Sequence, residues 1–180
     1  MTTLEKNYVK VELIGSVDAL LAEYRKAINE LICVIEPISE KQLSFVIDHT
    51  TTDEDCKSIQ TILTHVICSG YGYIIYIENY LGTNKPRLDK ITYENVNNYI
   101  EQLNLMFEYS LNFFQENSNL EIEQLDNTKK INVNWGQQYD IEQLVEHAIV
   151  HILRHRRQIE KFIKHENMPK EECETISDIE

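Results

Sequence analysis

The sequence predicts an all-α protein whose core is a four-helix bundle. Apolar residues recur at a spacing of three to four residues in four long segments of similar length. Only five glycines and three prolines occur in 180 residues, which argues against a turn-rich β protein and for long helices with few connections. Hydrophobic residues make up 42% of the chain, enough for a sizeable core. An antiparallel bundle is the simplest architecture for such segments.

The first predicted helix spans about residues 17–35. It ends before Pro37, because proline cannot continue a helix. Residues 39–43 then form a short turn that Ser39 caps. The apolar face of the helix consists of residues at helical spacing: Leu20, Leu21, Tyr24, Ala27, Ile28, Leu31 and Ile32.

The second predicted helix spans about residues 58–81, with Ser58 as its N-cap and Gly82 as its stop. Its many isoleucines and tyrosines would also suit a strand, but its length favours a helix. A linker with Pro86 follows at residues 83–91. The helical spacing is carried by Ile59, Ile62, Val66, Tyr73 and Ile77.

The third predicted helix spans about residues 93–116 and is capped by Thr92. A polar stretch follows, and then the segment 131–139, which contains the only tryptophan, Trp135, beside Gly136. The apolar stripe of this helix consists of Tyr99, Leu103, Met106, Phe107, Ser110, Phe113 and Phe114.

The fourth predicted helix spans about residues 140–164 and begins with Asp140 and Gln143, which resemble a capping box. Residues 1–165 are therefore expected to form one domain. The acidic tail 166–180 lacks apolar periodicity and is expected to be flexible. The long second and third connections leave the order of helix directions open.

The composition excludes several classes of partner. The formal net charge of −13 repels nucleic acid and anionic lipid, so neither is an expected partner. The first residues show no signal peptide and no stretch is apolar enough to span a bilayer, so a cytoplasmic location is expected. The four cysteines have no CxxC spacing and are expected to be free thiols, with Cys33 and Cys68 in the core.

Three of the six histidines, His147, His151 and His155, lie in the fourth helix at a spacing of four. Side chains four apart share a helix face, so such a pair can bind one metal ion. On a helical wheel with His151 at zero, His155 lies near +40° and His147 near −40°. His151 and His155 are therefore the better candidates. The apolar face lies between about +20° and +100° and consists of Ile141, Leu144, Ala148, Ile152, Ile159 and Phe162.

His65 in the second helix is the third candidate ligand. Ser69 and Gly72 are neighbours along its own column and are small, which leaves open volume beside the imidazole. A pocket for metal and substrate would explain that volume. The alternative is that Gly70 and Gly72 let a neighbouring helix approach closely.

Three neutral imidazoles suit zinc, nickel, iron or copper better than magnesium or calcium. Three protein ligands would also leave coordination positions open, as in catalytic sites. A di-iron bundle is excluded, because such proteins use Glu-x-x-His pairs and no histidine of this chain has a glutamate three residues before it.

Two segments resemble the DinB-like superfamily. The last helix contains LVEHAIVHILRHRRQIEKF, and the superfamily's His, three residues, His-Arg-x-Gln signature falls on His151, His155, Arg156 and Gln158. The single histidine of the superfamily's second helix matches His65 in SIQTILTHVICSGYGYI. Helix order and length are similar over most of the chain.

The resemblance implies an up-up-down-down four-helix bundle with one metal ion bound by His65, His151 and His155. Zinc and nickel are the expected metals. Members often form homodimers. Characterised relatives are metal-dependent transferases and isomerases that use low-molecular-weight thiols such as bacillithiol, mycothiol or glutathione. Residues that could support the ligands are Gln158, Tyr76, Ser69 and His147, although a surface position is favoured for His147.

The expected function is therefore that of a metal-dependent enzyme which activates a low-molecular-weight thiol or water towards a small-molecule substrate. No general base is evident in the sequence. The alternative is a non-catalytic metal-binding or stress-associated bundle in which the ion mainly fixes helix geometry. A bundle whose site has lost its metal is the third reading.

Overall fold

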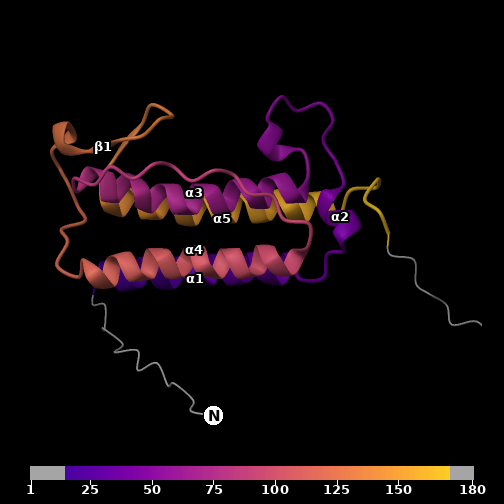
Figure 1. Ribbon diagram of the computed structural model, residues 1–180, viewed down its shortest axis with the longest axis horizontal. Helices are drawn as coiled ribbons and strands as arrows, with labels where there is room; N and C mark the ends of the chain where they lie inside the picture. Colours follow the sequence, from indigo (N-terminus) through magenta and orange to yellow (C-terminus); the bar gives the residue numbers. More distant parts are fainter. Residues whose placement is uncertain (1–14, 171–180) are drawn as a thin grey trace, which may run out of the picture.

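The computed structural model describes residues 15–170. Four long helices lie side by side and confirm the all-α class (Figure 1). They are α1 (Ser16–Ile35), α3 (Ile59–Tyr80), α4 (Val96–Glu116) and α5 (Ile141–Ile163). The connections contain the short helix α2 (Glu40–Ser44), the 3-10 turns η1 (Glu54–Cys56) and η2 (Asn127–Lys129), and the strands β1 (Ile131–Asn132) and β2 (Gln138–Tyr139). The two strands form an antiparallel hairpin in which Ile131 pairs with Tyr139.

Capping side chains start three helices at the predicted residues. The side chains of Ser39, Ser58 and Asp140 each accept a hydrogen bond from the third backbone N–H of the helix, and each forms a reciprocal capping box. The predicted start of the third helix is wrong: α4 begins at Val96, and its cap is Asn95. The Asn95 side chain accepts from the Asn98 N–H at 2.9 Å.

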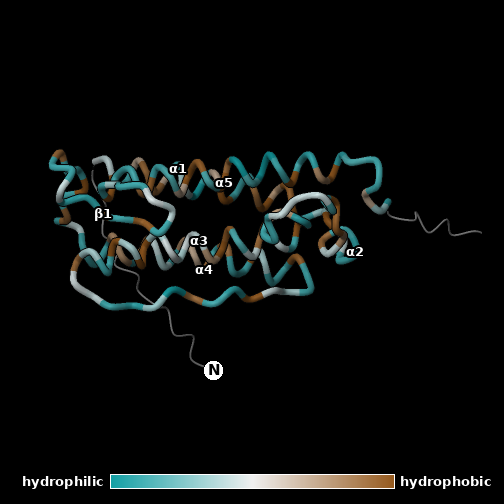
Figure 2. Tube along the Cα trace, turned by 90° about the horizontal axis from the view of Figure 1, so that it is seen from above, coloured by the Kyte–Doolittle hydropathy of each residue, from teal (hydrophilic) through white to brown (hydrophobic). Residues whose placement is uncertain are grey.

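The four long helices enclose one hydrophobic core. α1 packs against α5 and α4, and α3 packs against the same two helices. Brown and teal alternate along the helices in Figure 2, as expected for amphipathic helices that bury one face. Large side chains that are fully buried in this core include Ile28, Leu31, Ile62, Leu63, Tyr99, Leu103 and Leu144.

The helix directions differ from the predicted up-up-down-down order. Glu30 near the end of α1 contacts Arg156 near the end of α5, so these two helices run the same way. Thr64 near the start of α3 bonds Tyr99 near the start of α4, so α3 and α4 also run the same way. His65 near the start of α3 meets His151 in the second half of α5, so the two pairs are antiparallel. The order is therefore up-down-down-up.

The segment 81–95 explains this order. It runs back along α3 to the end where α3 began (Figure 1). Fully extended, the segment reaches about 50 Å, whereas the 22-residue α3 is about 33 Å long. The connection is therefore long enough to return the chain to the starting end, and α4 then repeats the direction of α3.

The cysteines of the described residues differ in burial. Cys33 is exposed, not part of the core, because it lies outside the buried stripe of α1, whereas Cys68 is buried as predicted. Cys173 lies outside the described residues. None of the helices in residues 15–170 has the length and apolar character needed to cross a bilayer.

The start of the predicted flexible tail packs onto the domain. Met168 is only 6% exposed and joins the hydrophobic core. The Gln42 side-chain amide donates to the carbonyl of Pro169 at 2.8 Å. Residues 171–180, the rest of that tail, lie outside the described part of the chain.

Candidate metal centre

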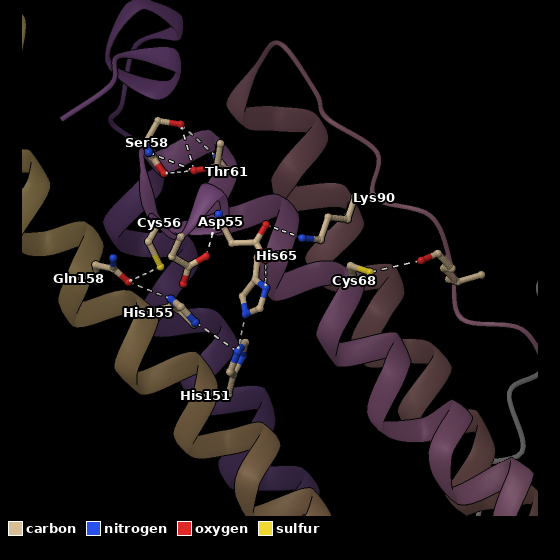
Figure 3. A network of polar contacts seen from close by, with 12 residues as sticks. Asp55, Cys56, Ser58, Thr61, His65, Cys68, Lys90, His151, His155 and Gln158 are labelled. Carbon is tan, nitrogen blue, oxygen red and sulfur yellow. Dashed lines mark hydrogen bonds and ion pairs between the residues drawn. The ribbon is translucent and has the colours of Figure 1, made fainter. Parts of the chain in front are cut away.

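The antiparallel packing of α3 and α5 brings three histidines to one point. His65 comes from the second turn of α3, and His151 and His155 lie one turn apart on α5. One nitrogen from each ring lies within 4.8 Å of the other two. His151 Nε2 is 2.9 Å from His65 Nε2 and 3.2 Å from His155 Nε2 (Figure 3).

Hydrogen bonds on the far side of two rings set their tautomers. His65 Nδ1 lies 3.0 Å from a carboxylate oxygen of Asp55, and His155 Nδ1 lies 3.1 Å from the side-chain oxygen of Gln158. Both oxygens accept, so both Nδ1 atoms carry the hydrogen. In the neutral rings the two Nε2 atoms therefore present lone pairs towards His151.

His151 completes the cluster from its Nε2 atom. Its Nδ1 is buried and has no hydrogen-bond partner among the described residues, so all its polar neighbours lie at Nε2. A proton on His151 Nε2 could bond to only one of the two lone pairs that face it, which would leave the other buried and unpaired. A cation placed among the three atoms would be bound by all three rings.

Burial keeps these imidazoles in the neutral form that binds metals. Burial, followed by the proximity of the other histidines, lowers the pKa of His151 to about 2. Burial also lowers the pKa of His155 to about 4. The pKa of His65 lies below its ordinary value as well, because burial outweighs the opposing charge of Asp55. All three rings are neutral at physiological pH.

The spacing of the nitrogens fits a small transition-metal ion. Nitrogens bound tetrahedrally at 2.0–2.1 Å from zinc would lie about 3.3 Å apart. The two measured Nε2–Nε2 distances are 2.9 and 3.2 Å. The donor set also matches, since neutral imidazole is a preferred ligand of zinc, nickel, iron and copper.

Asp55 is the site residue that the sequence did not reveal. It lies in η1, ten residues before His65, and its other oxygen pairs with Lys90 from the segment 81–95. Burial raises the pKa of Asp55, but the hydrogen bond from Lys90 and the nearby His65 more than offset this and hold it below the usual range. Metal-binding histidines commonly donate to a carboxylate, so a search for an acid near His65 could have found it.

A cavity of about 580 Å³ opens beside His65 and His151. Ser69 and Gly72 both line it, where open volume was predicted. A Cβ at Gly72 would have only Arg87 nearby, at 3.9 Å, whereas a Cβ at Gly70 would lie 2.0 Å from the sulfur of Met106. Each of the two predicted explanations therefore applies to one glycine. Gly70 allows the close approach of α4, and Gly72 faces the cavity.

His147 also lines this cavity but stands apart from the three-histidine cluster. Its ring is partly buried, whereas the sequence favoured a surface position. The ring stacks on Trp135, with centroids 5.4 Å apart, and its Nδ1 lies 3.1 Å from the hydroxyl of Tyr139. Burial lowers the pKa of His147. The hairpin shields one side of this ring, which a helical wheel for α5 alone cannot show.

The remaining predicted residues have clear contacts. The Tyr76 hydroxyl accepts from the backbone N–H of Asn134 at 3.1 Å, and its ring meets Trp135 edge-on. Tyr76 therefore holds the hairpin as a cavity wall. Arg156 turns away from the cluster and pairs with Glu30, which ties α5 to α1.

The match with known families agrees with this architecture. The profile of the DinB family matches residues 9–166, most of the chain. The comparison with curated proteins gave no significant match. Because the profile covers most of the chain, the chain belongs to the DinB family.

Proposed function

We propose that the protein binds one divalent transition-metal ion, zinc or nickel, through His65, His151 and His155, and is an enzyme. The convergence of three neutral imidazole nitrogens beside a cavity is the observation that carries this proposal. When bound, the ion supplies a Lewis acid that lowers the pKa of a thiol or of a water molecule towards neutrality. The proposed reaction is thiol transfer to an electrophile, or hydrolysis.

Side chains of the protein orient two of the three proposed ligands. Asp55 fixes the ring of His65, and Gln158 fixes the ring of His155, so that their Nε2 atoms face the common point. Within residues 15–170, three potential ligands meet at the cluster of histidines. A fourth coordination position is therefore left for a thiol or a water molecule. The adjoining cavity of about 580 Å³ has the size of a small-molecule site.

Metal content provides the first test. Elemental analysis of the purified protein should find about one equivalent of a transition metal, and His65→Ala, His151→Ala and His155→Ala should each abolish stoichiometric binding. His147→Ala should keep the metal, because this ring lies outside the cluster. Circular dichroism confirms that each variant is folded. Equal metal loss in His147→Ala would contradict the assignment of the three ligands.

Turnover provides the second test. Metal-loaded and metal-free protein should be compared for conjugation of an electrophile with bacillithiol, mycothiol and glutathione, and for hydrolysis of simple esters and amides. We expect turnover in one of these series that requires the metal. Metal binding without any metal-dependent turnover would favour the non-catalytic bundle.

A further inference from the structure

The cavity beside the histidines carries positive charge in a strongly acidic protein. The chain has a net charge of −13, yet the charged residues that line the cavity, apart from histidine, are Arg87, Lys90, Arg154 and a single acid, Asp55. Lys90 is paired with Asp55. Within residues 15–170, Arg87 and Arg154 have no ion-pair partner, so two guanidinium groups face the cavity uncompensated.

The two arginines reach the cavity from different elements. Arg87 comes from the segment 81–95, and its Nε would lie 3.9 Å from a Cβ at Gly72. Arg154 comes from α5, between His151 and His155 in sequence. Like charges gathered in one cleft repel one another, and a bound divalent cation would add to that repulsion. A negatively charged ligand would relieve it and would be drawn into the cleft.

Aromatic side chains also line the cavity. Trp135 is 41% exposed, although it meets Tyr73 and Tyr76 edge-on at centroid distances of 6.2 and 5.8 Å. The hairpin that carries Trp135 is held by the Tyr76 hydroxyl. His147 stacks on part of the indole, and the part that stays exposed offers the cavity an apolar surface against which a flat group can pack.

We infer that this cavity binds a small organic anion, in which a carboxylate or phosphate contacts Arg87 and Arg154 and a flat apolar body packs on Trp135. Guanidinium groups suit both anions, because their N–H donors match two oxygens at once. The inference rests on the proposed function in one respect: it takes this cavity as the substrate pocket of the metal site. It adds the charge and shape of the substrate.

Three probes of similar size test the inference: benzoate, phenyl phosphate and the neutral benzamide. Binding is followed by calorimetry and by the fluorescence of Trp135, the only tryptophan in the chain. We expect benzoate or phenyl phosphate to bind at least about tenfold more tightly than benzamide, since a hydrogen bond to a charged group is worth that much. The ratio of the affinities for benzoate and phenyl phosphate shows whether the cavity prefers a carboxylate or a phosphate.

Substitution of the arginines locates the contact. Arg87→Gln and Arg154→Gln should each weaken binding of the anion about tenfold or more and leave benzamide unchanged. Arg157→Gln is the matched control, because Arg157 is exposed on the same helix as Arg154 but does not line the cavity. An equal loss in Arg157→Gln, or equal binding of benzamide and the anions, would overturn the inference. So would the failure of all three probes to bind the folded protein.

Metal-free and zinc-loaded protein separate the inference from the proposed function. Anion binding that survives metal removal and weakens in Arg87→Gln supports the inference. Anion binding that requires zinc and ignores both arginine substitutions overturns it, since the anion is then a metal ligand, and leaves the proposed function standing. Arginine-dependent anion binding in a protein that takes up neither zinc nor nickel supports the inference and refutes the proposed function.

Discussion

At the scale of single residues, the site depends on groups that orient its ligands. Asp55 and Gln158 each hold one histidine by its Nδ1 atom, and Lys90 holds Asp55 (Figure 3). These partners leave the Nε2 atoms of His65 and His155 free of protons. The arrangement is a chain of contacts that runs from a surface lysine through a carboxylate to an imidazole.

Asp55→Ala should lower the affinity for the metal by about 10–100-fold without removing the site, because the ring of His65 loses its orienting partner. Competition with a chromophoric chelator measures this affinity. Asp89→Ala is the control, since Asp89 lies in the segment 81–95 beside Lys90 and does not line the cavity. Unchanged affinity in Asp55→Ala would show that the carboxylate does not support His65.

At the scale of elements, α3 uses different faces to pack against α4 and to line the cavity. One face meets α4 closely at Gly70, and another opens to the cavity at Gly72. The two glycines are two residues apart, about 200° around the helix axis, so they have different surroundings. A single helix therefore contributes both to tight core packing and to the wall of the candidate site.

Gly70→Ala should reduce the free energy of unfolding, whereas Gly72→Ala should leave it unchanged or raise it. A Cβ at Gly70 would overlap Met106, and overpacking costs about 1–3 kcal/mol. A Cβ at Gly72 meets nothing closer than 3.9 Å, so the helix gains up to about 1 kcal/mol from alanine. Urea unfolding measures both. Equal shifts in the two variants would contradict the assignment of the two faces.

At the scale of the whole molecule, the segment 81–95 carries the chain back along α3 and places α4 parallel to it. Tyr99 secures the end of this return. Its hydroxyl lies 2.7 Å from that of Thr64, accepts from the Tyr93 N–H at 3.1 Å and donates to the Gln60 carbonyl at 3.3 Å. The same segment carries Arg87 and Lys90 to the cavity, so the topology and the site depend on one connection.

Tyr99→Phe should lower the free energy of unfolding by about 1–3 kcal/mol, because it leaves the buried hydroxyl of Thr64 and the partly buried N–H of Tyr93 without their partner. Tyr93→Phe is the control, since that hydroxyl has no hydrogen-bond partner in the part of the chain that the structure describes. Thermal or urea unfolding measures both variants. A loss no greater than that of Tyr93→Phe would mean that Tyr99 does not secure the segment.

Local sequence signals are enough to predict the helices and most of their ends. Apolar periodicity and capping residues such as Ser58 and Asp140 act within a few neighbouring residues, so they can be read locally. Asn95 was missed because Thr92 is also an acceptable cap and lies at the start of the same apolar stripe. The spacing of His151 and His155 likewise placed both on one face of α5.

Long-range packing, by contrast, sets the helix directions, the partner of His65 and the walls of the cavity. The direction of α4 depends on the path of the segment 81–95, which has no periodicity to read. Asp55 and Trp135 lie in connections, and a helical wheel gives the face of a residue but not what packs against it. Such contacts join residues far apart in the chain, and they exist only once the helices have packed.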